Sequence, residues 1–288
     1  MHLPRNLVGV FLLEEKPMNE FTMKELLRSK EEKRILTGRI TGLEDEYYKI
    51  RNENIPCAIV WYDEIKILIP SEHLGTHKIN KAIIRGMIGA EIDFIIIEID
   101  KLSNIAIASR KEAMQLRAKI ELPKLKVNDT ARVRIVAVGT KYIVTDFYGK
   151  EVYILAENLR HTYIVNCRDL YTPGESLVVK IRRIDIENDK YELSAKDLIE
   201  NPYKNIRKYI IETGEYRGKV IGFPKGHSGI IVQLNETMVT CLIRVPARFN
   251  LYPHYLDEVL VRITEIKEQK KLIYGYLMKI ICGGKKIW

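Results

Sequence analysis

The chain has 288 residues, 46% hydrophobic and 30% charged, which is typical of a soluble globular protein of two or three domains. It contains no run near the roughly 18 apolar residues that a membrane helix requires, so we expect no membrane span and no membrane partner. The net charge of +9 is uneven, because residues 204–288 hold fifteen Lys and Arg against seven Asp and Glu, whereas residues 1–203 are nearly neutral. We therefore expect a polyanion to bind, with most of the phosphate contacts in the last third.

The four cysteines and six histidines are scattered along the chain. No two cysteines have the spacing of a zinc site, and disulfide scaffolds are shorter and richer in cysteine, so we expect free thiols in a reducing cytoplasm. The sequence also lacks the motifs of a phosphate-binding loop, a zinc protease and a serine hydrolase. It therefore favours a binding protein over an enzyme, and we expect no metal, no cofactor and no small-molecule substrate.

The first segment, residues 1–33, combines an extension with a lead-in helix. In the extension, two glutamates follow a short apolar patch without a small-residue cleavage site, which disfavours a secretory signal. Translation from Met1 and translation from Met18 both stay open. Residues 19–33 have apolar side chains at helical spacing and predict a short amphipathic helix.

Three later stretches share one pattern, in which alternating apolar and polar residues are interrupted by a short polar turn. This pattern indicates a β-hairpin. The hairpins recur at roughly 80 residues, and shorter strand-like runs precede each of them, which is typical of an internal repeat. We predict an all-β chain of three tandem five-stranded OB-fold barrels with short helical linkers and an N-terminal helix. The predicted domains are residues 34–112, 124–198 and 209–281.

Short motifs make a family resemblance specific. The first copy opens with Gly-Arg-Ile-Thr-Gly at 38–42, continues with Ile-Pro-Ser-Glu-His-Leu at 69–74 and ends with Ile-Asp, a turn and Ser-Arg at 99–110. The second copy has a similar ending at 184–196, and the third repeats the glycine motif at 218–222. The layout resembles tandem S1 domains, the RNA-binding OB fold of the bacterial ribosomal protein S1 family.

The resemblance implies a set of RNA-binding residues. In that family, aromatic side chains near the second strand, a His after the third strand, and an acidic and a basic residue in the last hairpin hold the RNA. An exposed aromatic ring stacks on a base for about 1–3 kcal/mol, and Lys or Arg neutralises phosphates. No copy has the complete set, so the predicted residues are spread over all three: Trp61, Tyr62, Tyr142, Arg182, Asp185, Lys190, Arg217, Phe223, Lys225, Arg244 and Lys271.

The function we expect is low-specificity binding of single-stranded RNA in the cytoplasm, with the ribosome or an RNase as a further partner. Two alternatives stay open. One is that the first two copies form a module that docks on a ribosomal, polymerase or RNase partner, because they are neutral and lack part of the aromatic set. A flat apolar face on their second and third strands would favour this alternative. Single-stranded DNA is the other, because stacking on bases does not distinguish it from RNA. For Trp61, Tyr62 and Tyr142, packing against the core competes with stacking.

Overall fold

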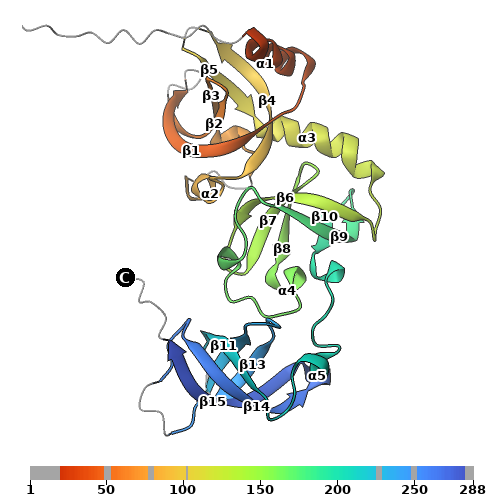
Figure 1. The fold of residues 1–288 in the computed structure, drawn as a ribbon. Coiled ribbons are helices and arrows are strands. Elements are labelled where there is room, and N and C mark those ends of the chain that lie inside the picture. Colours follow the sequence, from red (N-terminus) through yellow and green to blue (C-terminus); the bar gives the residue numbers. More distant parts are fainter. Residues whose placement is uncertain are drawn as a thin grey trace, which may run out of the picture. The chain divides into compact units, whose positions relative to one another are not determined.

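The computed structural model describes residues 20–48, 53–76, 81–101, 103–224, 229–247 and 252–282. Within these residues the chain forms three five-stranded sheets in succession, with few helices, as the sequence predicts (Figure 1). The chain divides into two compact units: the first holds the first sheet, and the second holds the other two. No helix in this part of the chain is both long and apolar enough to cross a membrane.

The first unit contains helix α1 and a closed barrel with the strand order β1-β2-β3-β5-β4. Neighbouring strands run antiparallel in the pairs β1–β2, β2–β3 and β4–β5, whereas β3 and β5 pair in parallel. This is the order of an OB fold. The elements are α1 (Glu20–Glu32), β1 (Leu36–Tyr48), β2 (Glu53–Tyr62), β3 (Ile65–Pro70), η1 (Ser71–His73), α2 (Lys81–Gly86), β4 (Glu91–Asp100) and β5 (Ile105–Ser109).

Helix α1 is fastened to this barrel by both apolar and polar contacts. Leu26 is fully buried. Ser29, also fully buried, donates from Oγ to the carbonyl oxygen of Arg34 at 2.7 Å and accepts the backbone N–H of Ile96 at 3.1 Å. Because Ile96 lies on β4, the predicted lead-in helix is part of the first folded unit.

The second sheet has the order β10-β9-β6-β7-β8, a partly open form of the predicted OB barrel. Among the described residues, β8 and β10 do not pair, although β3 and β5 do in the first copy. An ion pair spans this opening, from Lys150 Nζ on β8 to Asp189 Oδ1 before β10, at 2.7 Å. The elements are α3 (Arg110–Glu121), η2 (Leu122–Lys124), β6 (Thr130–Val138), β7 (Tyr142–Phe147), β8 (Lys150–Leu155), α4 (Ala156–Leu159), η3 (Cys167–Asp169), β9 (Ser176–Asp185) and β10 (Lys190–Ser194).

The third sheet closes again, in the order β11-β12-β13-β15-β14, with β13 and β15 parallel. Gly275 allows β14 and β15 to approach closely, since a Cβ there would lie 2.3 Å from the carbonyl oxygen of Arg262. The elements are η4 (Lys196–Leu198), α5 (Ile206–Tyr209), β11 (Glu215–Gly222), β12 (Gly229–Leu234), β13 (Thr240–Arg244), β14 (Glu258–Lys267), η5 (Glu268–Lys270) and β15 (Leu272–Cys282).

Each of the last two sheets surrounds a core of its own. Val133, Ile143 and Phe147 are fully buried in the second core, and Val220 and Val261 are fully buried in the third. Side chains alternate along a strand, so the same residues that fill these cores leave their neighbours on the outer face. This alternation decides which side chains a ligand can reach.

Candidate nucleic-acid interface

The outer face of β7 and β8 carries exposed aromatic side chains. Tyr142 on β7 is 40% exposed, and Tyr153 and Leu155 on β8 are 55% and 49% exposed. Tyr142 pairs with Leu155 across the ladder, and the ring centroids of Tyr142 and Tyr153 lie 5.5 Å apart at an interplanar angle of 49°. We call these three residues the tyrosine face. They lie on the second and third strands of the sheet, where OB folds bind oligonucleotides.

A tight turn positions Tyr142. The backbone N–H of Gly139 donates to the carbonyl oxygen of Tyr142 at 2.9 Å. The tyrosine ring lies over Gly139, where an added Cβ would be 2.7 Å from the nearest ring atom. Burial, and then the charge of Glu151, raises the pKa of Tyr153, so its hydroxyl stays neutral at physiological pH. Tyr153 therefore offers a neutral ring, and Gly139 leaves room for the ring of Tyr142.

Cations border the tyrosine face. Lys141 Nζ donates to the carbonyl oxygen of Ile164 at 2.9 Å and to the hydroxyl of Tyr163 at 3.1 Å, and it lies 4.5 Å from the centroid of that ring. Tyr163 is 52% exposed. The guanidinium carbon of Arg160 lies 6.0 Å from the ring centroid of Tyr171. The structure records no acidic partner for Lys141 or Arg160 within the described residues, so both positive charges remain available to an anion.

Of the three residues predicted in the last hairpin of this copy, Arg182 is engaged by the protein. Its guanidinium binds both carboxylate oxygens of Asp197, at 2.7 and 2.8 Å, and also contacts Asn158 and Glu192 at 3.1 and 3.2 Å. The hydrogen bond from Arg182 holds the pKa of Asp197 below its usual range. These contacts give Arg182 a structural role; its predicted contact with phosphate stays a prediction.

Asp185 and Lys190 occupy the ends of the β9–β10 turn and face each other in register. The Asp185 carboxylate accepts the backbone N–H of Asn188 at 3.1 Å and also binds Arg183 Nη2 at 3.0 Å. Those hydrogen bonds, that from the Asn188 backbone foremost, lower the pKa of Asp185. Asp185 thus closes the turn, while the exposed Lys190 projects from it.

In the third copy, two aromatic rings meet at the end of β11. Phe223 is 48% exposed and Tyr252 is 46% exposed, with ring centroids 6.2 Å apart. The Tyr252 hydroxyl donates to the carbonyl oxygen of Gly229 at 3.1 Å, and Gly229 pairs with Arg244 at the end of β13. The structure thus places the exposed Arg244 near a second pair of exposed rings. Lys225, predicted beside Phe223, lies outside the described residues.

The other two predicted residues of this copy lie elsewhere on its surface. Arg217 is exposed on β11. Lys271 is exposed after η5 and has left-handed backbone geometry with a φ of 53°. Arg217 is therefore on a strand surface, whereas Lys271 projects from the β14–β15 turn.

The first copy differs from the other two. Tyr62 is partly buried, and its hydroxyl donates to Glu25 Oε2 at 2.8 Å. Its ring packs edge-on against the buried Phe94, with the two ring centroids 6.5 Å apart. Burial, followed by the hydrogen bond to Glu25, raises the pKa of Tyr62 to about 12. Tyr62 therefore fastens α1 to the barrel, which agrees with the packing alternative. Trp61, its neighbour on β2, points to the other side of the strand and is 53% exposed.

Around Trp61, the outer face of β2 and β3 is apolar, and its side chains are buried from solvent. Cys57, Ile59 and Leu68 form a small cluster there and are only 1%, 3% and 8% exposed. They stand where the second copy presents its tyrosines and Leu155. Buried aliphatic side chains cannot stack on a base, so within the described residues of this face Trp61 is the side chain that fits such a contact.

Three aromatic residues of these surfaces, Tyr153, Tyr163 and Tyr252, are not among the sequence-predicted residues. Tyr153 could have been found by pairing Lys150–Leu155 with Tyr142–Phe147, since that register puts it on the side of Tyr142.

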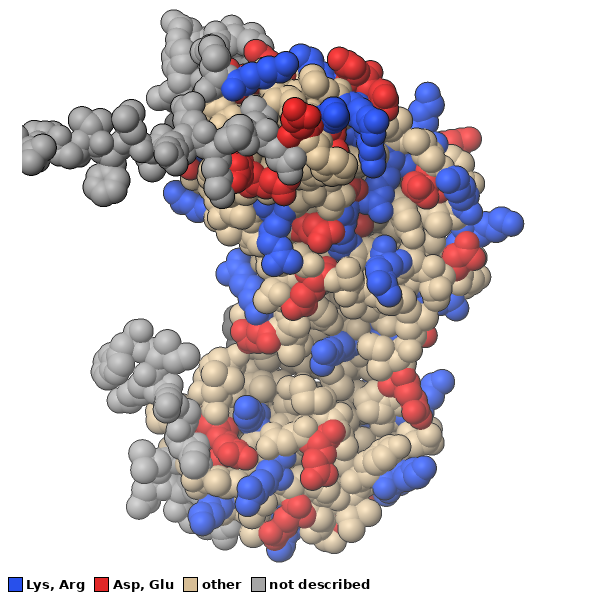
Figure 2. Space-filling view, turned by 45° about the horizontal axis from the view of Figure 1, so that its top comes forward, with Lys and Arg blue, Asp and Glu red and all other residues tan. Residues whose placement is uncertain are grey.

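Charged side chains of both signs are interspersed over the visible face of the molecule (Figure 2). Among the described residues no group of three or more His, Cys, Asp or Glu could hold a metal ion.

Comparison with known proteins adds a family likeness, although no family model matches the chain. The small ribosomal subunit protein bS1 of Staphylococcus saprophyticus is 26% identical over 128 residues, which are 43% of this chain and 33% of that protein. The bS1 protein of Streptococcus pneumoniae is 23% identical over 189 residues, 63% of this chain and 46% of that protein. The chain resembles the bS1 proteins. It spans between a third and a half of their length, and the predicted S1 resemblance is confirmed.

Two further matches accompany the bS1 proteins. A 4-hydroxy-3-methylbut-2-enyl diphosphate reductase of Clostridium acetobutylicum is 25% identical over 235 residues, 75% of this chain and 35% of that enzyme. A solved multidomain protein with nucleic acid binding domains from Streptococcus pneumoniae is 13% identical, with a TM-score of 0.23, over 85% of this chain and 73% of that one. Together with the bS1 resemblance, the fold supports RNA binding in general.

Proposed function

We propose that this chain binds single-stranded RNA with low sequence specificity, acting in the cytoplasm, at the ribosome or with an RNase, as a binding protein without catalysis of its own. The observation that carries the proposal is the tyrosine face. It is exposed, it lies on the second and third strands of an OB-type sheet, and the cationic Lys141 adjoins it. The bS1 resemblance supports the same function.

The chemistry of the tyrosine face explains why low specificity is expected. Every base has a π-face, so stacking on Tyr142 or Tyr153 favours any unpaired base. Duplex RNA hides its bases in the stack and presents mainly phosphates and 2′-hydroxyls, so a stacking surface favours a single strand. Lys141 and Arg160 would add an attraction to phosphate that weakens as salt is added.

The three copies are proposed to contribute unequally. The second copy offers the tyrosine face, and the third offers Phe223 and Tyr252 beside Arg244. The first copy has a closed apolar face in the equivalent place, with Trp61 exposed at its edge. The alternative function, docking on a protein partner, therefore has its support in the first copy, where a lone exposed tryptophan suits a protein interface.

The test is fluorescence anisotropy of a labelled twelve-nucleotide oligouridylate titrated with the whole chain. Matched probes are the oligodeoxythymidylate of the same length and a twelve-base-pair RNA duplex. We expect the RNA single strand to bind with a Kd on the order of micromolar at low salt, more tightly than the duplex. Equal binding of duplex and single strand would contradict stacking, and equal binding of the DNA strand would show that the surface does not select RNA.

A further inference from the structure

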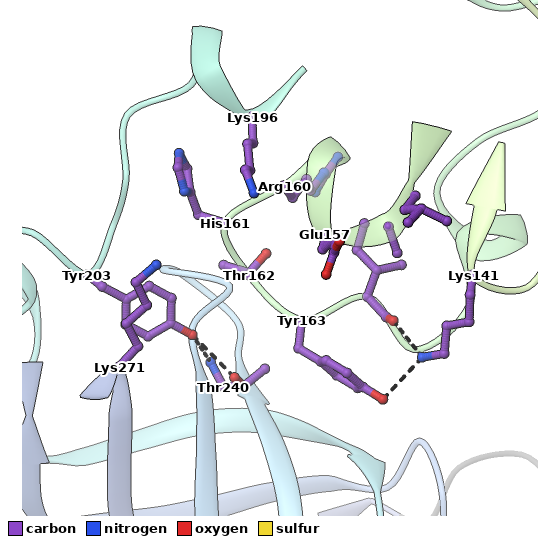
Figure 3. A pocket seen from close by; sticks show the side chains of 13 residues that line it. Lys141, Glu157, Arg160, His161, Thr162, Tyr163, Lys196, Tyr203, Thr240 and Lys271 are labelled. Atoms are coloured by element: carbon purple, nitrogen blue, oxygen red, sulfur yellow. Dashed lines mark hydrogen bonds between the residues drawn. The ribbon is translucent and has the colours of Figure 1, made fainter. Parts of the chain in front are cut away.

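A cavity of about 630 Å³ lies within the second unit, beside the segment that follows α4 (Figure 3). Two polar contacts fix the segments that carry the lining residues His161 and Tyr203. His161 Nε2 lies 3.1 Å from the carbonyl oxygen of Ile199, and the hydroxyl of Tyr203 lies 3.2 Å from Thr240 Oγ1. Tyr203 is also buried in the third core. Ligand pockets usually measure roughly 300–1,000 Å³, so this cavity has the size of a binding site.

The polar lining of the cavity is mainly cationic. Lys141, Arg160, Lys196 and Lys271 all line it, and Glu157 is the acidic residue among the described residues that do so. Lys196 and Lys271 reach toward the same space from opposite sides (Figure 3). Neither has an ion pair within the described part of the chain, although the Asp197 carboxylate interacts electrostatically with Lys196. Two converging lysines form an electrostatic site for an anion.

An aromatic ring stands beside these cations. Tyr163 lines the cavity, is 52% exposed and has one side of its ring near Lys141 Nζ. Cations that converge near an exposed ring match a ligand with an anionic group and a flat π-system, which is the chemistry of a nucleoside phosphate. Lys141 and Leu155 line the cavity as well, and Leu155 belongs to the tyrosine face. The cavity is therefore continuous with that face.

We propose that the cavity binds one nucleotide of the single strand that crosses the tyrosine face, with its phosphate between Lys196 and Lys271 and its base on Tyr163. This inference rests on the proposed function and adds a defined phosphate subsite to it. The same chemistry would accept a nucleotide inside a strand or a free nucleoside monophosphate, and the experiment separates these two ligands.

The experiment compares two double variants of the whole chain. Lys196→Gln with Lys271→Gln removes the two converging charges and keeps side chains of similar length. Glutamine tolerates the left-handed backbone at position 271 as well as lysine does. The matched control is Lys126→Gln with Lys279→Gln, which removes the same charge from exposed lysines that do not line the cavity. Lys126, Lys271 and Lys279 are exposed, and Lys196 is partly exposed. Substitutions on the surface usually change stability by less than about 0.5 kcal/mol. Affinity for the labelled oligouridylate is measured by anisotropy over a range of salt concentrations, and uridine monophosphate is tested as a competitor.

Each phosphate neutralised on a single strand contributes about 0.7 to the slope of log affinity against log salt, and the proposed subsite holds one phosphate. We expect the Lys196/Lys271 variant to lose about 0.7 of this slope, which corresponds to roughly 5-fold weaker binding at 0.1 M salt if the affinities coincide at 1 M. A slope equal to that of the control variant, in a chain that still binds RNA, would overturn the subsite. Failure of the parent chain to bind RNA would instead overturn the proposed function. Competition by uridine monophosphate that depends on Lys196 and Lys271 would assign the cavity to free nucleotides as well; no competition would assign it to nucleotides within a strand.

Discussion

Replacing both rings of the tyrosine face, by Tyr142→Leu with Tyr153→Leu, should weaken RNA binding strongly and change stability little. Leucine preserves an apolar side chain on each strand and removes the ring that stacks. The two rings lie 5.5 Å apart and are both at least 40% exposed, so a base can approach either of them.

The magnitude follows from that geometry. A stacked base is worth about 1–3 kcal/mol by truncation of its aromatic partner. Because the two rings touch, their contributions should overlap rather than add fully. We expect a loss of about 2–3 kcal/mol, which is roughly 30- to 150-fold in Kd. Loss of the contact between the rings should lower the free energy of unfolding by about 1 kcal/mol.

The assay is anisotropy of the labelled oligouridylate at one fixed salt concentration, with urea unfolding as the measure of stability. The matched control is Tyr209→Leu, because Tyr209 on α5 is 55% exposed and lies away from the tyrosine face. The reasoning would be refuted if the double variant bound RNA within twofold of the parent chain. It would also be refuted if the control lost as much affinity as the double variant.

Three further predictions follow from single contacts. Gly139→Ala should displace the Tyr142 ring and weaken RNA binding several-fold, with less effect than Tyr142→Leu in the same anisotropy assay, because the added Cβ would lie 2.7 Å from the ring; unchanged affinity would contradict this positioning. Arg182→Gln should lower the free energy of unfolding by about 1 kcal/mol in urea at pH 7 and change RNA affinity less than twofold, because Arg182 is bound by Asp197. Since the folded pKa of Asp197 is lowered, this loss of stability should be present above about pH 4 and disappear as the pH falls through the folded pKa. A loss that persisted at that low pH would refute the pairing. Cys57, Cys167 and Cys241 are buried, and burial raises the pKa of the Cys241 thiol to about 12, so iodoacetamide at pH 8 should leave all three unmodified in the native chain, as mapped by mass spectrometry. The stability that the neutral Cys241 thiol provides should decline as the pH rises above about 9. Rapid alkylation of Cys241 without denaturant would contradict its burial.

The sequence predicted the fold well because its evidence is periodic and repeated. Alternation along each hairpin and the recurrence of the hairpins predict three five-stranded domains, and all three sheets are present in the structure. What the sequence could not indicate is whether each sheet closes. Closure depends on pairing between the third and fifth strands, and in the second copy β8 and β10 do not pair.

The site was predictable only in part, because the roles of its residues depend on distant neighbours. Tyr62 looks like a stacking residue in sequence, but Glu25, 37 positions earlier, binds its hydroxyl. Arg182, predicted as a phosphate ligand, also binds both carboxylate oxygens of Asp197, a structural role that the sequence pattern does not indicate. Tyr142 is 40% exposed, so its ring is accessible, and its predicted contact with RNA stays a prediction.

The measurement that tests the central claim most directly is photochemical cross-linking of the whole chain to single-stranded oligouridylate, with the attached peptides identified by mass spectrometry. The account predicts cross-links at Tyr142, Tyr153 and Tyr163 in the second copy and at Phe223 or Tyr252 in the third. Cross-links that map to the first copy alone, or that leave β7 and β8 unmodified while RNA is bound, would contradict it.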